Sequence, residues 1–210
     1  MAETSPPVRP VAERVLDATA RITVEDGWGA VTMAKVASIA GVSRQTVYNE
    51  YGAKPALGQA MVLRELERFL AVVAHELDTH DDLVDAIRSA AEQTLLLAQA
   101  NPLLNRLLAS AHGVSAGAPG ADTGLLPFLT TDAAPVIAAA RDVILARLAR
   151  FPDLGLSPGE VDASIDAIVR LVLSHVMQPG HGPARTADDL AWIVARVLGT
   201  RSRPAGSVGA

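Results

Sequence analysis

A serine flanked by glycines is the first feature of this sequence that suggests catalysis. Residues 113–117 read Gly-Val-Ser-Ala-Gly, so Ser115 would be the nucleophile of a serine hydrolase, with His175 and several aspartates downstream. That chemistry needs a strand before the serine and a helix directly after it. Here a helical pattern precedes Ser115 and a Gly/Pro-rich stretch follows it. A hydrolase therefore stays as an alternative, and we expect no enzymatic activity.

Two histidines imitate the zinc-binding motif H-E-x-x-H. His75 is followed by Glu76, but the second histidine, His80, comes one residue too late for the motif. Residues five apart on a helix project about 140° from each other, so the two rings cannot bind one ion. The absence of cysteine also excludes thiolate ligands and disulfides. We expect neither a metal nor another cofactor.

A third set of side chains suits DNA recognition. Ala37, Gly41 and Val47 have the spacing of a helix-turn-helix. The alanine lets the two helices approach, the glycine permits a positive φ in the turn, and the valine locks the second helix onto the first. That second helix exposes polar side chains able to bond base edges and phosphates. They are Arg44, Gln45, Thr46, Tyr48 and Asn49.

The elements that must position these residues are helices. Helical periodicity runs through the chain, no segment alternates as a strand, and only seven residues are aromatic. We expect an all-α fold, with Thr32, Ser43, Ser157 and Thr186 as helix caps. The expected helices cover 11–26, 32–40, 43–51, 54–77, 81–100, 103–112, 125–129, 134–151, 158–177 and 187–198.

Charge divides the chain near residue 58. Residues 1–58 hold six of the 18 Lys and Arg and six of the 23 Asp and Glu, so the net charge of −5 arises entirely from residues after 58. This partition leaves DNA possible as a partner of the N-terminal part. No uncharged stretch reaches the roughly 18 residues of a membrane span. The opening residues lack the apolar run of a secretory signal, so we expect a cytoplasmic protein without a membrane partner.

Further N-terminal residues complete a family pattern. They are the amphipathic first helix, Thr32, Ile39 to Ser43, Thr46 to Tyr48, Tyr51, Lys54 and Leu57. In these residues the sequence resembles the TetR family of transcriptional regulators. The resemblance implies a three-helix DNA-binding domain over 1–58, a larger helical ligand-sensing and dimerisation domain over 59–200, and a disordered tail over 201–210. Ser43–Glu50 and His175–Pro179 also resemble regulators of alkane-hydroxylase genes in actinobacteria, whose preference for arginine over lysine this chain shares.

The resemblance assigns roles on DNA. Arg44 and Gln45 would meet base edges, while Thr46, Tyr48 and Lys54 would hold phosphates. The full set of expected DNA-binding residues is Thr32, Ser43, Arg44, Gln45, Thr46, Tyr48, Asn49, Tyr51 and Lys54. The family often has a neutral polar residue at the position of Glu50. This carboxylate either points away from the duplex, which we favour, or accepts from a cytosine amino group.

The family's sensor domain implies a ligand pocket among residues 81–112 and 125–177. Its apolar lining and sparse polar groups predict a small lipophilic effector, such as a fatty acid, an alkane derivative or an acyl thioester. The expected ligand-binding residues are Leu97, Leu104, Asn105, Leu108, His112, Phe128, Leu129, Val172 and His175. For each histidine, an ordinary structural role is the alternative.

The last two helices of this family usually form a four-helix bundle with a second copy. Their apolar surface here exceeds what one thin domain covers, which favours a homodimer. The expected dimerisation residues are Ile165, Val169, Val172, Val176, Trp192, Ile193 and Val197. Core packing within one chain is the alternative for any one of them.

We expect a repressor that binds a palindromic operator and is released by its effector. A helical interaction protein without DNA binding is a further alternative.

Overall fold

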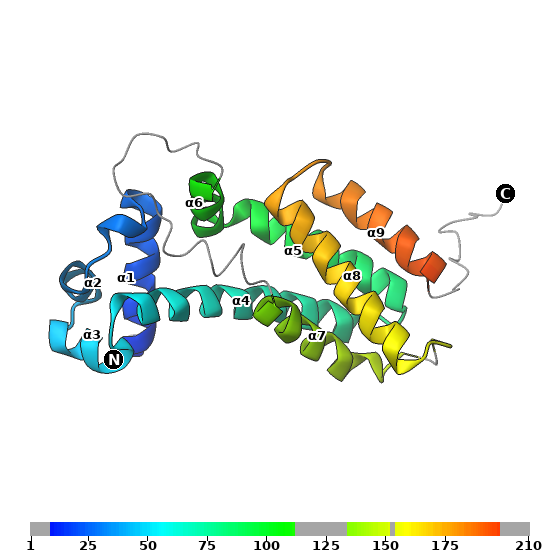
Figure 1. The fold of residues 1–210 in the computed structure, drawn as a ribbon, viewed down its shortest axis with the longest axis horizontal. Helices are drawn as coiled ribbons and strands as arrows, with labels where there is room; N and C mark the ends of the chain where they lie inside the picture. Colours follow the sequence, from blue (N-terminus) through cyan, green and yellow to red (C-terminus); the bar gives the residue numbers. More distant parts are fainter. Residues whose placement is uncertain (1–8, 112–133, 152–153, 198–210) are drawn as a thin grey trace, which may run out of the picture. The chain divides into compact units, whose positions relative to one another are not determined.

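The fold is seen in a computed structural model that describes residues 9–111, 134–151 and 154–197 (Figure 1). In these ranges the regular structure is helical, as the sequence predicts, and no strand occurs. The expected helix over 125–129, the tail over 201–210 and Ser115 lie outside the described residues. None of the helices within the described ranges is long and apolar enough to span a membrane.

The chain divides into two compact units. The described part of unit 1 comprises residues 9–65 and 101–111, and that of unit 2 comprises residues 66–100, 134–151 and 154–197. Unit 1 contains α1 (Val11–Asp26), the short 3-10 helix η1 (Trp28–Ala30), α2 (Met33–Ala40), α3 (Arg44–Tyr51), the first part of α4 (Lys54–Thr79) and α6 (Pro102–Ala111). Unit 2 contains the rest of α4 with α5 (Leu83–Ala100), α7 (Ala134–Leu148), α8 (Pro158–Met177) and α9 (Pro183–Val197).

This division differs from the boundary expected at residue 58. Residues 59–65 of α4 belong to unit 1, and so does α6, which the sequence analysis placed in the sensor domain. The reason is packing: Leu103 and Leu107 of α6 are buried in the core that contains Leu57 and Met61 of α4. At the start of α6, Asn101 donates from Nδ2 to Glu65 Oε2 over 2.9 Å.

Local signals determine the helix ends of unit 1. Thr32 caps α2 by accepting from the backbone N–H of Lys35, and Ser43 caps α3 by accepting from that of Thr46. Between them, Gly41 adopts a left-handed conformation with φ of 64°, which glycine reaches without the Cβ clash of other residues. The expected turn of the helix-turn-helix is therefore present.

The core of unit 2 relies on small side chains. α5 packs along α9 and also contacts α8; the three are green, orange and yellow in Figure 1. Buried alanines occur on both partners, and Ala91 of α5 clusters with Ala187 and Leu190 of α9. A second cluster joins Leu77 of α4 to Phe151, which follows α7.

Of two helix starts in unit 2, that of α8 matches the sequence prediction and that of α9 does not. α8 begins with the expected capping box, in which Ser157 Oγ accepts from the backbone N–H of Glu160 and the Glu160 carboxylate accepts from that of Ser157. α9 begins at Pro183, four residues before the expected start, since proline suits the first helical turn. Thr186 is therefore buried inside α9, and its expected role as the cap is wrong.

Candidate DNA-binding surface and sensor residues

The recognition helix α3 is fixed by its buried side. Val47 is 0% exposed and belongs to the core of unit 1. At 100° per residue, Gln45 and Asn49 lie about 160° and 200° around the helix from Val47, so both point almost directly away from the core. Both side chains are exposed, and so are those of Arg44 and Tyr48. The polar residues expected to read DNA thus lie on one accessible face.

The exposed side chains of α3 are paired one turn apart. Arg44 Nη2 donates to the Tyr48 hydroxyl over 3.2 Å, and its guanidinium lies 5.4 Å from the centre of the Tyr48 ring. Gln45 Nε2 donates to Asn49 Oδ1 over 2.8 Å. These contacts restrict side chains that would otherwise move freely, so part of the entropy cost of ordering them on DNA is already met.

The caps and Glu50 occupy the rest of the α3 surface. The hydroxyls of Ser43 and Thr46 lie 2.8 Å apart, so the cap and the expected phosphate-binding threonine are hydrogen-bonded to each other. Glu50 is exposed and lies about 140° around the helix from Gln45. This position accords with a carboxylate directed away from the bases, which stays a prediction.

Arg14 of α1 is a residue that the sequence analysis missed. Its Nε donates to the carbonyl of Ala40 over 3.0 Å, and its Nη2 donates to the carbonyls of Ala40 and Gly41, the latter over 2.9 Å. The guanidinium therefore binds the C-terminal end of α2, where helix carbonyls are unsatisfied and the dipole is negative. Twenty-six residues separate Arg14 from Ala40, and no local sequence signal relates them.

Tyr51 and Lys54, both expected to contact DNA, are engaged inside unit 1. The Tyr51 hydroxyl donates to the carbonyl of Ala12 over 3.1 Å. Burial, followed by the negative charge of Glu50, raises the pKa of Tyr51. Lys54 Nζ donates to the carbonyl of Trp28 over 2.8 Å and lies 4.9 Å from the centre of its ring. A contact to DNA from either residue stays a prediction.

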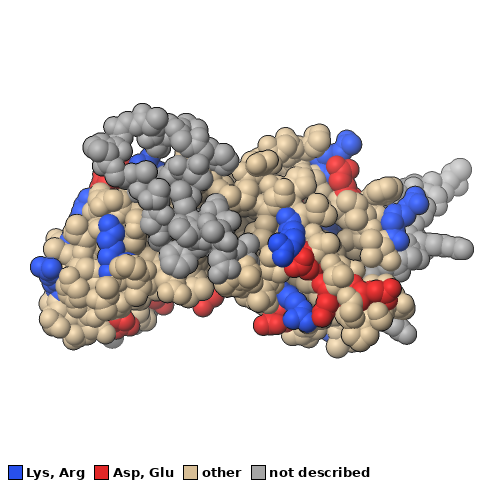
Figure 2. All heavy atoms as spheres, in the orientation of Figure 1, with Lys and Arg blue, Asp and Glu red and all other residues tan. Residues whose placement is uncertain are grey.

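Ion pairing distinguishes Arg44 from other basic residues of unit 1. Arg21 pairs with Glu25, Lys35 with Asp26, and Arg9 and Arg64 both pair with Asp17. Arg44 has no carboxylate partner within the described ranges. On the face shown in Figure 2, acidic and basic groups lie side by side over unit 2. The unneutralised charge of Arg44 suits a polyanion.

The expected ligand-binding residues divide between the units. Leu104, Asn105 and Leu108 are on α6 in unit 1, while Leu97, Val172 and His175 are in unit 2. His112, Phe128 and Leu129 lie outside the described residues. Of the described six, the four aliphatic residues and His175 are half-buried, whereas Asn105 is exposed.

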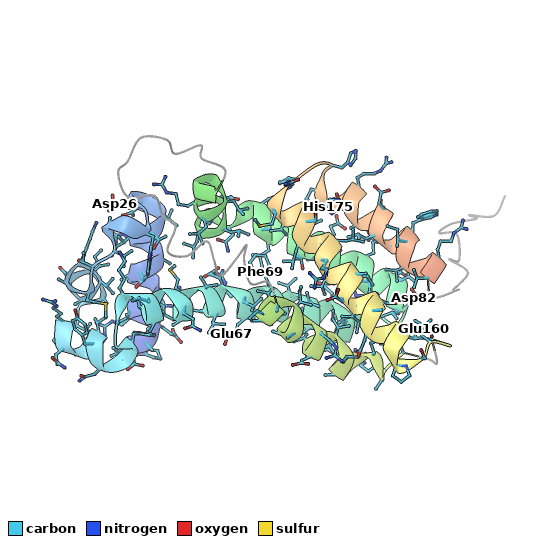
Figure 3. The ribbon with its side chains drawn as sticks, in the orientation of Figure 1. Asp26, Glu67, Phe69, Asp82, Glu160 and His175 are labelled. Atoms are coloured by element: carbon cyan, nitrogen blue, oxygen red, sulfur yellow. The ribbon has the colours of Figure 1, made fainter. Side chains whose placement is uncertain are left out.

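Val172 and His175 both make side-chain contacts within unit 2. Val172 packs against the cluster formed by Ala91, Ala187 and Leu190. His175, near the end of α8 in Figure 3, donates from Nδ1 to the carbonyl of Leu171 over 2.8 Å. A carbonyl can only accept, so this bond leaves Nε2 of a neutral His175 as an acceptor.

Thr94 of α5 is a polar residue that the sequence analysis did not single out. Its side chain is 9% exposed, and its hydroxyl has no hydrogen-bond partner in the described part of the chain. By contrast, Thr19 and Thr23 of α1 donate to the carbonyls four residues earlier. The buried hydroxyl of Thr94 therefore retains its full bonding capacity inside unit 2.

The expected dimerisation residues include exposed and buried side chains. Trp192, Ile193 and Val197 of α9 are exposed, by 61% for Trp192 and 52% for Val197. Of the expected residues on α8, Val169, Val172 and Val176 are half-buried. Ile165 is instead buried within its own chain, because it packs inside unit 2, so it is not accessible to a second copy.

The histidine pair of the zinc-like motif has no metal-binding arrangement. His80 Nδ1 lies 2.9 Å from the carbonyl of Glu76, while His75 is exposed. In the described ranges, no group of three or more His, Asp or Glu side chains could hold a metal ion.

Comparison with known proteins decides the family. Residues 15–61 match the model of bacterial regulatory proteins of the tetR family, and residues 82–196 match that of the C-terminal domain of bacterial tetracycline repressors. The chain belongs to the TetR family. TetR-family proteins are transcriptional regulators rather than enzymes, so the hydrolase alternative and the non-DNA-binding alternative are both wrong.

Individual relatives agree with this assignment. The HTH-type transcriptional regulator AlkX of Mycobacterium tuberculosis is 36% identical over 186 residues, which cover 87% of this chain and 82% of that protein. The crystal structure of the TetR family repressor AlkX from Dietzia sp. strain DQ12-45-1b, implicated in biodegradation of n-alkanes, has a TM-score of 0.68 and 26% identity. It covers 95% of this chain and 98% of its own. The fatty acid degradation regulator FadR from Bacillus halodurans shares the fold, with a TM-score of 0.54 and 13% identity over 94% of this chain and 99% of its own.

Proposed function

We propose that this TetR-family protein is a homodimeric repressor that binds a palindromic operator through α3 and is released by a small lipophilic effector. The observation that carries the proposal is the outward face of α3. Its polar side chains are exposed, paired and opposite a fully buried valine, and Arg44 among them has no carboxylate partner in the described ranges. A helix of this kind fits the major groove.

The exposed face of α9 supports dimerisation. Trp192, Ile193 and Val197 present large apolar side chains to solvent. An isologous contact with the same face of a second copy would bury them and place two recognition helices on one DNA molecule. Two half-sites about one helical turn apart would then form the palindrome.

The effector proposal rests on unit 2 and on the relatives. The half-buried side chains of Leu97 and Val172 offer apolar contacts, and the unpartnered hydroxyl of Thr94 offers one buried hydrogen bond. The Dietzia relative is implicated in biodegradation of n-alkanes. We therefore favour an alkane derivative or a fatty acid, in which a long chain carries a single polar end. The acyl thioester stays a weaker choice, because its head group is much larger.

The response to the effector requires two conformations. α4 is one continuous helix whose first part belongs to unit 1 and whose second part belongs to unit 2, so it is the covalent element that both activities share. An effector that binds the DNA-incompetent conformation more tightly shifts the population away from DNA, and by linkage DNA weakens effector binding equally.

Selection from random DNA tests the regulator. We expect wild-type protein to enrich a palindrome, and Arg44→Ala to relax the preference at one base pair per half-site. Arg21→Ala, which removes an exposed arginine paired with Glu25, is the matched control and should leave the sequence preference unchanged. Enrichment of no palindrome by the wild type would sink the proposal.

Titration of the operator complex with medium-chain alkanols and fatty acids tests the effector. We expect at least one of these compounds to lower operator affinity in a saturable way. Thr94→Val should make this response weaker. If saturating ligand of both classes leaves operator affinity unchanged, the effector class is wrong while the DNA-binding function stands.

The cytoplasm is the compartment in which a DNA-binding regulator acts, and we propose that location with the function.

A further inference from the structure

We infer that Gln45 and Asn49 act as one amide unit that reads an adenine in each half-site of the operator. The inference rests on the proposed function and deepens it, because it names a base and the atoms that recognise it. It starts from the 2.8 Å hydrogen bond between Gln45 Nε2 and Asn49 Oδ1 on the exposed surface of α3.

The position of the pair makes it the part of unit 1 best placed to enter a groove. Gln45 and Asn49 flank the direction opposite Val47, which is fully buried. Arg44 and Tyr48 lie to one side of this direction, and Thr46 lies to the other. When α3 approaches the base pairs, the amide pair therefore meets the floor of the groove first, and its neighbours lie nearer the groove walls.

The bond between the two amides determines what they offer to a base. It uses one N–H of Gln45 and the oxygen of Asn49. Gln45 Oε1 is left as an acceptor and Asn49 Nδ2 as a donor, while the second N–H of Gln45 is a further donor. Reversal of both amides would leave an acceptor and donors again, now from the opposite residues. In either arrangement the pair presents an acceptor beside a donor.

Only one base has the complementary edge in the major groove. Adenine presents the acceptor N7 beside the donor N6 amine, whereas guanine presents two acceptors, N7 and O6. The amide pair therefore matches adenine and leaves a donor–acceptor mismatch with guanine. The guanidinium of Arg44 has only donors and matches guanine. We expect adjacent G·C and A·T base pairs in each half-site, read by Arg44 and by the amide pair respectively.

Coupling between the residues separates this inference from two independent contacts. If the pair is the reading unit, Gln45→Ala and Asn49→Ala each remove most of the discrimination against G·C at the adenine position. The double substitution then adds little more. We expect the wild type to favour A·T over G·C there by about 5- to 150-fold, the range of one bidentate base contact.

Gln45→Glu gives a change of preference rather than a loss. Glutamate has only acceptors, and Asn49 Nδ2 would then donate to it, so the pair would present an acceptor to the base. An acceptor at this place suits the N4 amine of cytosine, and the preferred pair should change from A·T toward C·G. Gln59→Glu introduces the same carboxylate at an exposed amide of α4 and should leave the preference unaltered.

The test is random-DNA selection with these variants, followed by affinity measurements on the operator with the adenine replaced by 7-deazaadenine or by purine. The first analogue lacks N7 and the second lacks the N6 amine. Each should weaken wild-type binding and have little effect on the Gln45→Ala Asn49→Ala protein. Thermal unfolding of each variant checks that the fold is kept.

Three outcomes are distinguishable. An A·T preference that both single variants lose and both analogues weaken supports the amide unit. A palindrome without such a position, or with one that the variants do not change, overturns this inference and leaves the proposed repressor intact. If the wild type enriches no palindrome, the proposed function fails, and the inference fails with it.

Discussion

Arg14 illustrates how a side chain outside the recognition helix determines where that helix lies. Its guanidinium joins α1 to the carbonyls of Ala40 and Gly41, directly before α3. The same contact limits the turn, because a Cβ placed on Gly41 would lie 3.1 Å from Arg14 Nη2. The sequence predicts the role of Gly41 from the local turn. It does not predict the contact of Arg14 with this turn, because that interaction exists only in the folded unit.

Arg14→Ala should destabilise unit 1. The substitution removes charge-assisted bonds to the end of α2 and leaves part-buried carbonyls unsatisfied, at a cost of about 2 kcal/mol. We expect a lower unfolding midpoint in urea and weaker operator binding with unchanged base preference. Arg21→Ala on the same helix removes only an exposed pair and should cost less than about 0.5 kcal/mol. Equal losses in the two variants would contradict the role given to Arg14.

Thr94→Val should stabilise the effector-free protein. The change keeps the shape of the side chain and removes a buried hydroxyl that has no partner in the described ranges, with an expected gain of about 1 kcal/mol. For a chain of this length, that gain raises the unfolding midpoint by about 2–4 °C. Thr19→Val, at a hydroxyl that donates to Val15, should instead lower the midpoint. Calorimetry of both variants measures the contrast in sign.

At the scale of the helices, the ends are the most predictable feature, since the residues that cap a helix are local in the sequence. Thr32, Ser43 and Ser157 are caps in the structure, as the sequence predicts. Thr186 also resembles a cap, but Pro183 starts α9 earlier and buries the threonine. The 3-10 helix η1 gives no periodic signal over three residues and was not predicted.

The capping box of α8 predicts a dependence on pH. The hydroxyl of Ser157, and next its backbone N–H, hold the pKa of Glu160 below its ordinary value. The folded protein thus favours the carboxylate, and this contribution is present above the pKa of the unfolded chain. It disappears as the pH falls through the lower pKa of the folded chain.

Glu160→Gln provides the measurement. Glu160 lies at the exposed start of α8 in Figure 3, and the variant should be less stable than the wild type at neutral pH. The difference in unfolding midpoint between the two proteins should shrink below about pH 4. A difference that stays constant from pH 7 to pH 3 would show that the charge of Glu160 makes no contribution.

The whole molecule combines predictable helices with a division that only packing reveals. The all-α fold, the family and the face of α3 follow from residue types and spacing. That α6 belongs to unit 1 does not follow from the sequence. The spacing of Leu103 and Leu107 would be the same whether they packed in the core of unit 1 or in that of unit 2. The same limit applies to Ile165: periodicity places it on an apolar stripe, and only the tertiary contacts decide that it is internal.

Trp192→Glu tests the assembly of the whole molecule. Trp192 is 61% exposed, and Trp192→Glu would place a carboxylate within the apolar isologous contact of both copies. We expect a monomer in sedimentation analysis and a large loss of operator affinity. Leu96→Glu on α5, at a side chain that is 43% exposed, should leave the sedimentation unchanged. A dimeric Trp192→Glu protein would show that the copies associate through another surface.

The packing of α5 on α9 has a consequence for the order in which unit 2 opens. Alanines such as Ala91 and Ala187 let the two helices approach closely, so α9 cannot shift without leaving a void. Amide hydrogens along this pair should exchange with solvent late, and those of α7 earlier.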